Sequence, residues 1–92
     1  MEFDFKGQTA VVTGGTRGIG RAVSEAFLKA GAKVIATYRS NEEEAKNFTE
    51  ANTVYAECLD IYKFDVSCYD EVEKFYKEVE NKHGTLQIVV VS

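Results

Sequence analysis

The sequence predicts an α/β fold built on a parallel sheet with helices on both of its faces. Short, nearly continuous apolar runs recur along the chain, as expected of strands that are covered on both sides. Amphipathic helical stretches separate these runs, and a glycine-rich turn directly follows the first one. Connections of this length join parallel strands by crossovers. We therefore expect the order β-α-β-α-β-α-β and, by analogy with doubly wound folds, the sheet order 3-2-1-4.

Composition limits the chain to one domain and excludes several classes of function. Of its 92 residues, 45% are hydrophobic and 28% are charged, with a net charge of −4. No basic run is present, which argues against a nucleic-acid partner. The longest apolar run, Ile88–Val91, is far too short to span a membrane, and residues 1–6 lack the pattern of a signal peptide. Cys58 and Cys68 lack Cys-x-x-Cys spacing, so we interpret them as reduced thiols of a cytoplasmic protein.

The first predicted strand and helix flank the glycines. Residues 9–13 form a short apolar run that suits a buried strand. A helix is predicted from Ile19 onwards, and Gly31 stands at the position that usually ends a helix. The apolar stripe of this helix comprises Ile19, Ala22, Val23, Ala26, Phe27 and Ala30.

Residues 33–38 form the second predicted strand. Ser40, with Glu43 three residues later, is typical of a capping box that opens a second helix, which is acidic in its first turn. The end of this helix falls somewhere within residues 51–59, where no glycine marks it. Residues 53–55 would also suit a strand.

The last third of the chain predicts one more crossover unit. Residues 61–64 form the third strand and lead into Asp65, and Ser67 is expected to cap a third helix that Gly84 closes. Residues 86–91 form the fourth strand. The apolar face of the third helix consists of Val72, Phe75, Tyr76 and Val79.

The glycine-rich turn, Thr-Gly-Gly-Thr-Arg-Gly-Ile-Gly, predicts a Rossmann-type dinucleotide site. Gly14 suits the positive φ of a tight turn, Gly18 lets a pyrophosphate approach the backbone, and Gly20 lets helix and strand pack closely. The N–H groups and dipole of the following helix attract the anion. A phosphate-loop NTPase is disfavoured, since Arg21 and Ala22 replace the required Lys-Ser/Thr pair.

The spacing Thr-Gly-x-x-x-Gly-x-Gly resembles the turn of the short-chain dehydrogenase/reductase family. The resemblance covers almost the whole chain. Segments 12–20 (VTGGTRGIG), 30–34 (AGAKV) and 38–45 (YRSNEEEA) are similar to bacterial 3-oxoacyl-(acyl-carrier-protein) reductases in particular. Asp65, followed by Val66, stands where the family has its adenine-contacting aspartate. The resemblance implies that residues 1–92 are the N-terminal part of a single dinucleotide-binding domain.

The end of the second strand favours NADP over NAD. NAD enzymes normally carry a carboxylate there for the ribose 2′-hydroxyl, whereas this chain has Tyr38 followed by Arg39. Arg39 could pair with a 2′-phosphate, Arg17 could reach it from the turn, and Ser40 could touch it. Charge-assisted hydrogen bonds of this kind contribute roughly 1.5–3 kcal/mol each. Three of the candidate residues also have an alternative role without a cofactor. Arg39 would then be a solvated surface charge, Arg17 would bond a nearby backbone carbonyl, and Asp65 would be a polar residue at the end of a strand.

The candidate cofactor residues form one set, and the sequence offers no catalytic residue or metal ligand. None of the five tyrosines has a lysine four residues later, as the family's Tyr-x-x-x-Lys motif requires, and His83 sits at a predicted helix end. Val91 and Ser92 occupy the places of two family asparagines, and Val91 cannot make the polar contacts that the first asparagine makes on the nicotinamide side. The candidate residues are Gly14, Thr16, Arg17, Gly18, Ile19, Gly20, Tyr38, Arg39, Ser40, Asp65 and Val66.

Two hypotheses follow. In the first, the chain is the NADP(H)-binding portion of an oxidoreductase whose parent is a carbonyl reductase similar to the 3-oxoacyl reductases of fatty acid biosynthesis. In the alternative, it is a non-catalytic nucleotide-binding fragment or an engineered half-domain. Strand 86–91 would be an unprotected apolar edge. We therefore expect the remainder of a parent chain or a second copy to cover it, in a homo-oligomer.

Overall fold

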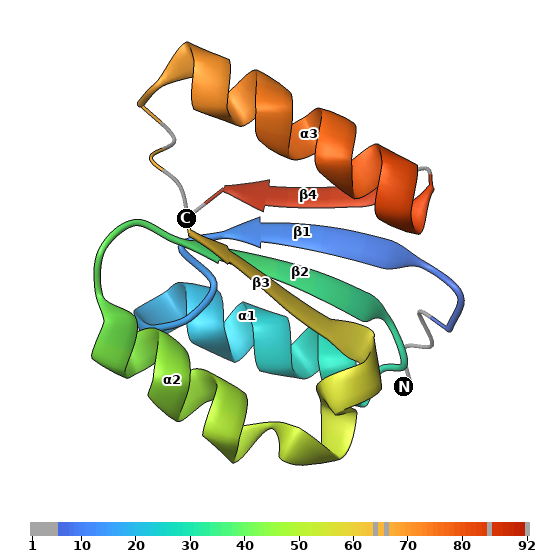
Figure 1. Ribbon diagram of the computed structural model, residues 1–92. Coiled ribbons are helices and arrows are strands. Elements are labelled where there is room, and N and C mark those ends of the chain that lie inside the picture. The colour runs from blue at the N-terminus through green and yellow to red at the C-terminus, as the bar shows by residue number, and fades with distance from the viewer. Residues whose placement is uncertain (1–5, 64, 66, 85, 92) are drawn as a thin grey trace.

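The computed structural model of the chain describes residues 6–63, 65, 67–84 and 86–91. Within these residues, helices alternate with the strands of a single sheet (Figure 1). No helix among them is long and apolar enough to cross a membrane. The strands are β1 (Thr9–Thr13), β2 (Lys33–Tyr38), β3 (Leu59–Lys63) and β4 (Ile88–Val91). The helices are α1 (Gly18–Lys29), α2 (Glu42–Ala51) and α3 (Tyr69–His83), and a 3₁₀ segment, η1 (Thr53–Cys58), precedes β3.

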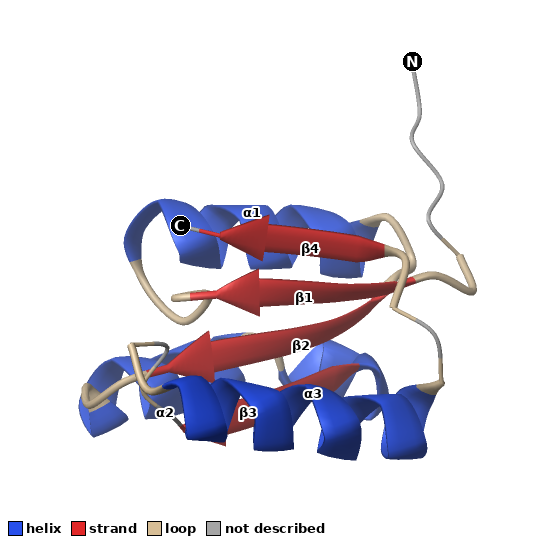
Figure 2. Cartoon of the chain, turned by 90° about the horizontal axis from the view of Figure 1, so that it is seen from above, coloured by secondary structure: helices blue, strands red, loops and turns tan. Residues whose placement is uncertain are grey.

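The sheet is parallel throughout and has the order β3-β2-β1-β4. This order confirms the predicted fold class and strand order. In the register, Val11 of β1 lies beside Ile35 of β2 on one side and Val89 of β4 on the other. Figure 2 shows β4 at one edge of the sheet, with β1 as its neighbour.

Each face of the sheet has its own apolar core, because successive strand residues point to opposite faces. Helix α3 covers one face, and α1 and α2 cover the other (Figure 1). The core under α3 contains Val11, Ile35, Phe75 and Val79. The core under α1 and α2 contains Val12, Leu28, Val34, Ala36 and Phe48. Strands covered on both faces are apolar at nearly every position, which explains the continuous runs in the sequence.

The apolar stripe predicted for α1 is wrong in part. Ile19 is 80% exposed, and Ala22 and Ala26 are exposed as well. Val23 and Phe27 of the predicted stripe do pack against the core under α1 and α2. The fully buried positions of the helix nevertheless include Ser24 and Leu28, which the stripe left out. The helix approaches the sheet through small residues, and hydropathy does not mark a small polar residue as buried. The contact face is therefore rotated from the predicted one.

The capping box predicted for α2 is also wrong, by one residue. The helix begins at Glu42 with Asn41 as its N-cap, and the Asn41 side chain accepts a hydrogen bond from the Glu44 N–H at 3.0 Å. Ser40 and Glu43 have the same spacing as Asn41 and Glu44, and serine and asparagine are both favoured N-cap residues. The sequence is therefore compatible with either residue as the cap. Asn41 is the residue that caps the helix, so the Ser40 hydroxyl takes no part in the cap.

The start of α3 shows a similar displacement. The N-cap residue is Cys68, which makes no side-chain capping bond, and not Ser67 as predicted. The Ser67 hydroxyl instead donates to Asp65 at 2.7 Å. Gly84 closes α3 with a φ of 80°, as predicted.

The connection between α2 and β3 settles the boundary that the sequence left open. Helix α2 ends at Ala51, and residues 53–58 form the 3₁₀ segment in place of a strand. Strand β3 begins at Leu59, two residues before the predicted start, and β4 begins at Ile88, two residues after it. Leu86 nevertheless packs against the core under α3. These are shifts of element ends, the part of a fold that sequence patterns define least.

Candidate nucleotide-binding site

The glycine-rich turn adopts the backbone geometry that its residues predict. Gly14 and Gly18 have φ values of 65° and 58°, in the left-handed region that favours glycine. The turn is fastened to β2 by two bonds from consecutive N–H groups. Gly15 N donates to the Thr37 carbonyl at 3.1 Å, and Gly14 N donates to the Thr37 hydroxyl at 3.3 Å. The turn is therefore held in one conformation by the neighbouring strand.

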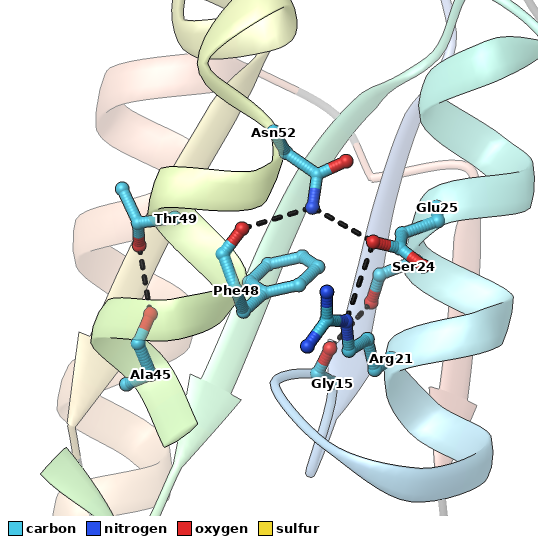
Figure 3. Close-up of polar contacts among 8 residues, drawn as sticks. All are labelled: Gly15, Arg21, Ser24, Glu25, Ala45, Phe48, Thr49 and Asn52. Atoms are coloured by element: carbon cyan, nitrogen blue, oxygen red, sulfur yellow. Dashed lines mark hydrogen bonds and ion pairs between the residues drawn. The ribbon is translucent and has the colours of Figure 1, made fainter. Parts of the chain in front are cut away.

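Gly15 is a structurally required glycine of the turn that the sequence pattern did not single out. A Cβ at this position would lie 2.7 Å from Ser24 Oγ and 2.8 Å from the Val12 carbonyl oxygen. The Ser24 hydroxyl donates to the Gly15 carbonyl at 3.0 Å and so fixes α1 against the turn (Figure 3). The available signal was the second glycine of the Gly-Gly pair, which the dinucleotide spacing does not itself require.

Gly18 has the opposite surroundings. A Cβ built at this position would meet nothing within 4 Å. The open space lies at the first residue of α1, where an α-helix leaves its backbone N–H groups without intrahelical partners. Arg17, the N-cap residue, makes no side-chain capping bond. An anion can therefore approach this backbone closely, which fits the role predicted for Gly18.

Helix α1 also differs in charge from the other described helices. Its first turn holds no acidic residue, whereas the first turns of α2 and α3 contain Glu42–Glu44 and Asp70–Glu71. Acidic side chains complement the positive end of a helix dipole, so α2 and α3 are already satisfied by their own sequence. The N-terminus of α1 remains available to an external anion.

A cavity of about 430 Å³ opens where the turn meets the end of β2. The residues that line it are Gly14, Thr16, Arg17, Tyr38, Arg39, Ser40 and Asn41. Six of these residues were predicted as cofactor ligands, and they come from two segments more than 20 positions apart. The lining contains two arginines and no carboxylate. Thr16 is almost fully buried, so the fold holds this part of the lining in place.

Of the remaining four predicted residues, apart from Gly18, the three that the structure describes each have different surroundings. Gly20 is buried in the first turn of α1, consistent with close packing of helix and strand. The Ile19 side chain is largely exposed, so it is available at the surface and takes no part in the core. Val66 lies outside the described residues. Asp65 follows the end of β3 and contacts Arg39 of the cavity lining.

The contact between Asp65 and Arg39 joins the two predicted ends of the site. Arg39 Nε lies 3.6 Å from Asp65 Oδ2, and the arginine side chain is 76% exposed. Asp65 Oδ1 accepts two bonds from Ser67, from its hydroxyl at 2.7 Å and from its N–H at 2.9 Å. These bonds and the Arg39 charge hold the pKa of Asp65 below its ordinary value. Asp65 is thus an oriented carboxylate that lies outside the cavity lining, next to Arg39.

A second polar group flanks the cavity on the α2 side. The Tyr38 hydroxyl donates to Glu42 Oε2 at 2.9 Å, and Lys63 Nζ pairs with Glu42 Oε1. The Lys63 and Tyr38 hydrogen bonds lower the pKa of Glu42, and the bond to Glu42 raises the pKa of Tyr38. The sequence alone indicated no acid beside Tyr38, because Tyr38 and Glu42 come into contact only after α2 has formed.

A buried asparagine connects the helices that carry the two halves of the cavity. Asn52 Nδ2 donates to Glu25 Oε2 of α1 and to the Phe48 carbonyl of α2, each at 2.9 Å (Figure 3). Arg21 Nε also donates to Glu25, at 3.3 Å. The Asn52 bond, followed by Arg21, lowers the pKa of Glu25. Because Asn52 and Glu25 are 27 residues apart, no local pattern could have indicated this link.

Comparison with known proteins agrees with this geometry. Acetoacetyl-CoA reductase of Paracoccus denitrificans is 39% identical over 83 residues, 90% of this chain and 32% of the relative. L-Rhamnose 1-dehydrogenase (NADP(+)) of Thermoplasma acidophilum is 37% identical over 87 residues, 95% of this chain and 34% of the relative. The chain thus spans about a third of the length of the curated relatives that it matches.

A solved structure shows the same arrangement of elements. The crystal structure of a short-chain dehydrogenase/reductase, a glucose/ribitol dehydrogenase from Brucella melitensis, superposes with a TM-score of 0.83 at 31% identity. The match covers 97% of this chain and 37% of the other. Residues 8–92 also match the family model described as short chain dehydrogenase. The glycine turn, the strand order and these matches together assign the chain to the short-chain dehydrogenase/reductase family.

Proposed function

We propose that the chain is the NADP(H)-binding part of an oxidoreductase that reduces a carbonyl group. The observation that carries this proposal is the cavity lining, in which Arg17 and Arg39 flank the end of β2 and no carboxylate is present. A 2′-phosphate is a doubly charged anion at neutral pH, and arginine binds phosphate oxygens through two parallel hydrogen bonds. A carboxylate at the same place would favour the 2′-hydroxyl of NAD.

The residues present fit such a cofactor. The N–H groups at the start of α1 and the open space above Gly18 would hold the pyrophosphate. Arg17, Arg39 and Ser40 would hold the 2′-phosphate, and Asp65 would accept a bond from the adenine amine. When bound, the cofactor supplies a hydride from its nicotinamide ring. The protein residues described above bind and orient its adenosine half.

The ion pair between Arg39 and Asp65 does not compete strongly with phosphate binding. Its atoms lie 3.6 Å apart and the arginine is mostly exposed. Exposed ion pairs of this kind contribute little to stability. Arg39 can therefore turn toward a phosphate at small cost, while Ser67 continues to orient Asp65.

The proposed parent activity rests on the relatives. Their names include acetoacetyl-CoA reductase and an NADP(+)-dependent dehydrogenase. We propose that a parent protein reduces a 3-oxoacyl substrate and is located in the cytoplasm. Its catalytic residues would be a serine and a Tyr-x-x-x-Lys pair, and this sequence contains no such pair. The rival is a nucleotide-binding fragment without activity. The intact mass of the native protein, with an assay of NADPH oxidation by a 3-oxoacyl thioester, separates the two.

Replacing Arg39 with aspartate tests the cofactor assignment. Wild-type protein should bind NADPH more tightly than NADH, and Arg39→Asp should invert this preference. The loss of NADPH affinity should be roughly tenfold to a hundredfold, the equivalent of one charge-assisted contact. Lys77→Glu is a matched control, because it reverses a charge on exposed α3. Equal affinity of the wild-type protein for the two cofactors, measured by calorimetry, would contradict the proposal.

We also propose that another polypeptide segment covers the β4 edge. Val89 is 51% exposed, and β4 stands last in the sheet order of the described residues. Unprotected apolar edges pair with other strands. The 92-residue chain should therefore associate at micromolar concentration, and Val89→Lys should shift it toward monomer with little change in its unfolding free energy. Sedimentation velocity measures both species. A folded wild-type chain that stays monomeric at all concentrations would refute this.

A further inference from the structure

The structure brings an acid to the end of β2 that the sequence had hidden. Residues 38–41 all line the cavity, and Glu42 comes next in the chain. Its carboxylate reaches back to the Tyr38 hydroxyl, at 2.9 Å. An acid at the end of this strand is the feature by which such folds select the 2′-hydroxyl of NAD. An unneutralised Glu42 would therefore work against a 2′-phosphate bound by Arg39 and Ser40.

Lys63 neutralises this acid from a position fixed by the sheet. Lys63 is the last residue of β3, and the parallel register places it directly beside Tyr38 of β2. Its ammonium group pairs with Glu42 Oε1 while Tyr38 holds Oε2. Both carboxylate oxygens are thus engaged by neighbouring strand ends. Glu42 is not one of the described residues that line the cavity.

Stability does not account for this arrangement. The Lys63 and Glu42 side chains are more than half exposed, and exposed pairs contribute little to folding free energy. The position of the pair next to Arg39 and Ser40 matters more. A charge that is exposed in the free protein becomes partly shielded from water when a nucleotide fills the cavity, and its interaction with a phosphate then grows.

We propose that Lys63 is a positioning residue for cofactor choice: by pairing with Glu42, it keeps the acid at the end of β2 from opposing a 2′-phosphate. The inference rests on the proposed NADP site. It adds that the preference depends on a residue in β3, outside the two segments that line the cavity. Lys63 touches no cofactor atom in this scheme and acts through Glu42.

The test compares two nucleotides that differ only in the 2′-phosphate, adenosine 2′,5′-bisphosphate and adenosine 5′-monophosphate. Both need only the adenosine half of the site. Their dissociation constants, measured by calorimetry on the 92-residue chain, give a selectivity ratio for each variant. Lys63→Met should lower this ratio by about two- to fivefold, the range of one exposed charge pair. Lys63→Arg should preserve it, and Glu42→Gln combined with Lys63→Met should restore it.

Lys46→Met is the matched control, since Lys46 pairs with Glu50 on the same helix, at 4.0 Å. It should leave the ratio unchanged. Equal weakening of both nucleotides by Lys63→Met, or failure of the double variant to restore the ratio, would overturn the inference. A wild-type ratio near one would refute the NADP proposal instead. The Lys63 effect remains measurable in that case, as a shift of the ratio below the wild-type value, and its absence would again overturn the inference.

Discussion

The two ends of the parallel sheet differ in how far their charged groups are paired with one another. At the carboxyl end, the cavity between the glycine turn and β2 presents Arg17, Arg39 and backbone N–H groups. At the amino end, a cavity of about 300 Å³ contains charged residues that bond to one another. There, Asp60 Oδ2 lies 2.9 Å from both Lys82 Nζ and His83 Nε2. The carboxyl end contains ion pairs as well, Arg39 with Asp65 and Lys63 with Glu42, but it also exposes two arginines and free helix N–H groups to a ligand.

The helix directions explain this difference. In a parallel αβ fold, helix N-termini lie near the carboxyl ends of the strands and helix C-termini near the amino ends. Helix α1 brings an N-terminus without acidic residues to the carboxyl end, whereas α3 brings the basic residues Lys82 and His83 in its last turn to the amino end. Basic residues complement a helix C-terminus, and Asp60 of β3 balances them. An uncompensated helix N-terminus therefore distinguishes the candidate site, and a cluster of charges alone does not.

Substituting one glycine at each end of the sheet separates effects on nucleotide binding from effects on stability most clearly. Gly15→Ala would force a Cβ against Ser24 Oγ and the Val12 carbonyl oxygen. We expect a loss of about 1–3 kcal/mol in unfolding free energy, together with a loss of affinity for adenosine 2′,5′-bisphosphate, because the turn must move. Urea denaturation and calorimetry measure the two quantities.

Gly84→Ala at the amino end is the matched control. Gly84 has a φ of 80° but no neighbour within 4 Å of an added Cβ. Backbone strain should cost about 1–3 kcal/mol, while the folded fraction binds the nucleotide as the wild-type protein does. Unchanged stability and binding in Gly15→Ala would contradict the close contacts of Gly15 and its role in holding the turn.

Long-range order was predictable wherever residue type and spacing had a single reading. The alternation of strands and helices followed from four apolar runs and their crossovers, and the positive φ of Gly14 followed from the turn motif. The strand order came only by analogy with doubly wound folds. Six residues of the cavity lining were predicted from two short segments. Parallel topology itself brings the ends of neighbouring strands together, so these residues meet whatever the details of packing.

Two kinds of feature could not be predicted from the sequence. One is the choice between adjacent N-cap residues, and the other is contact between residues that are far apart in the chain. Ser40 and Asn41 are both good N-caps with a glutamate three residues later, and only the geometry of α2 selects Asn41. The pairing of Glu42 with Lys63 arises between α2 and β3, which are 21 residues apart at this contact. The rotated face of α1 reflects close packing through Ser24, which no hydropathy pattern reveals.

The smallest effect is expected at the amino end. Asp60→Asn removes the charge that Lys82 and His83 share, and we expect a loss of about 1 kcal/mol in unfolding free energy at pH 7. Affinity for adenosine 2′,5′-bisphosphate should not change, because the residue lies at the far end of the sheet. Glu57→Gln is the control, since it removes an equal charge from the same cavity lining. A change in nucleotide affinity in Asp60→Asn alone would show that the two ends are coupled.

The pH dependence of this loss identifies its origin. Burial raises the pKa of Asp60, but the bonds and charges of Lys82 and His83 outweigh burial and leave the pKa below its ordinary value. A carboxyl whose pKa is lower in the folded than in the unfolded state contributes stability above its unfolded pKa, about 3.9, and loses it as the pH falls through the folded value. The stability difference between wild-type protein and Asp60→Asn should therefore shrink below about pH 4 in urea denaturation. A difference that stays constant down to pH 2 would mean that packing, and not charge, is what Asp60 contributes.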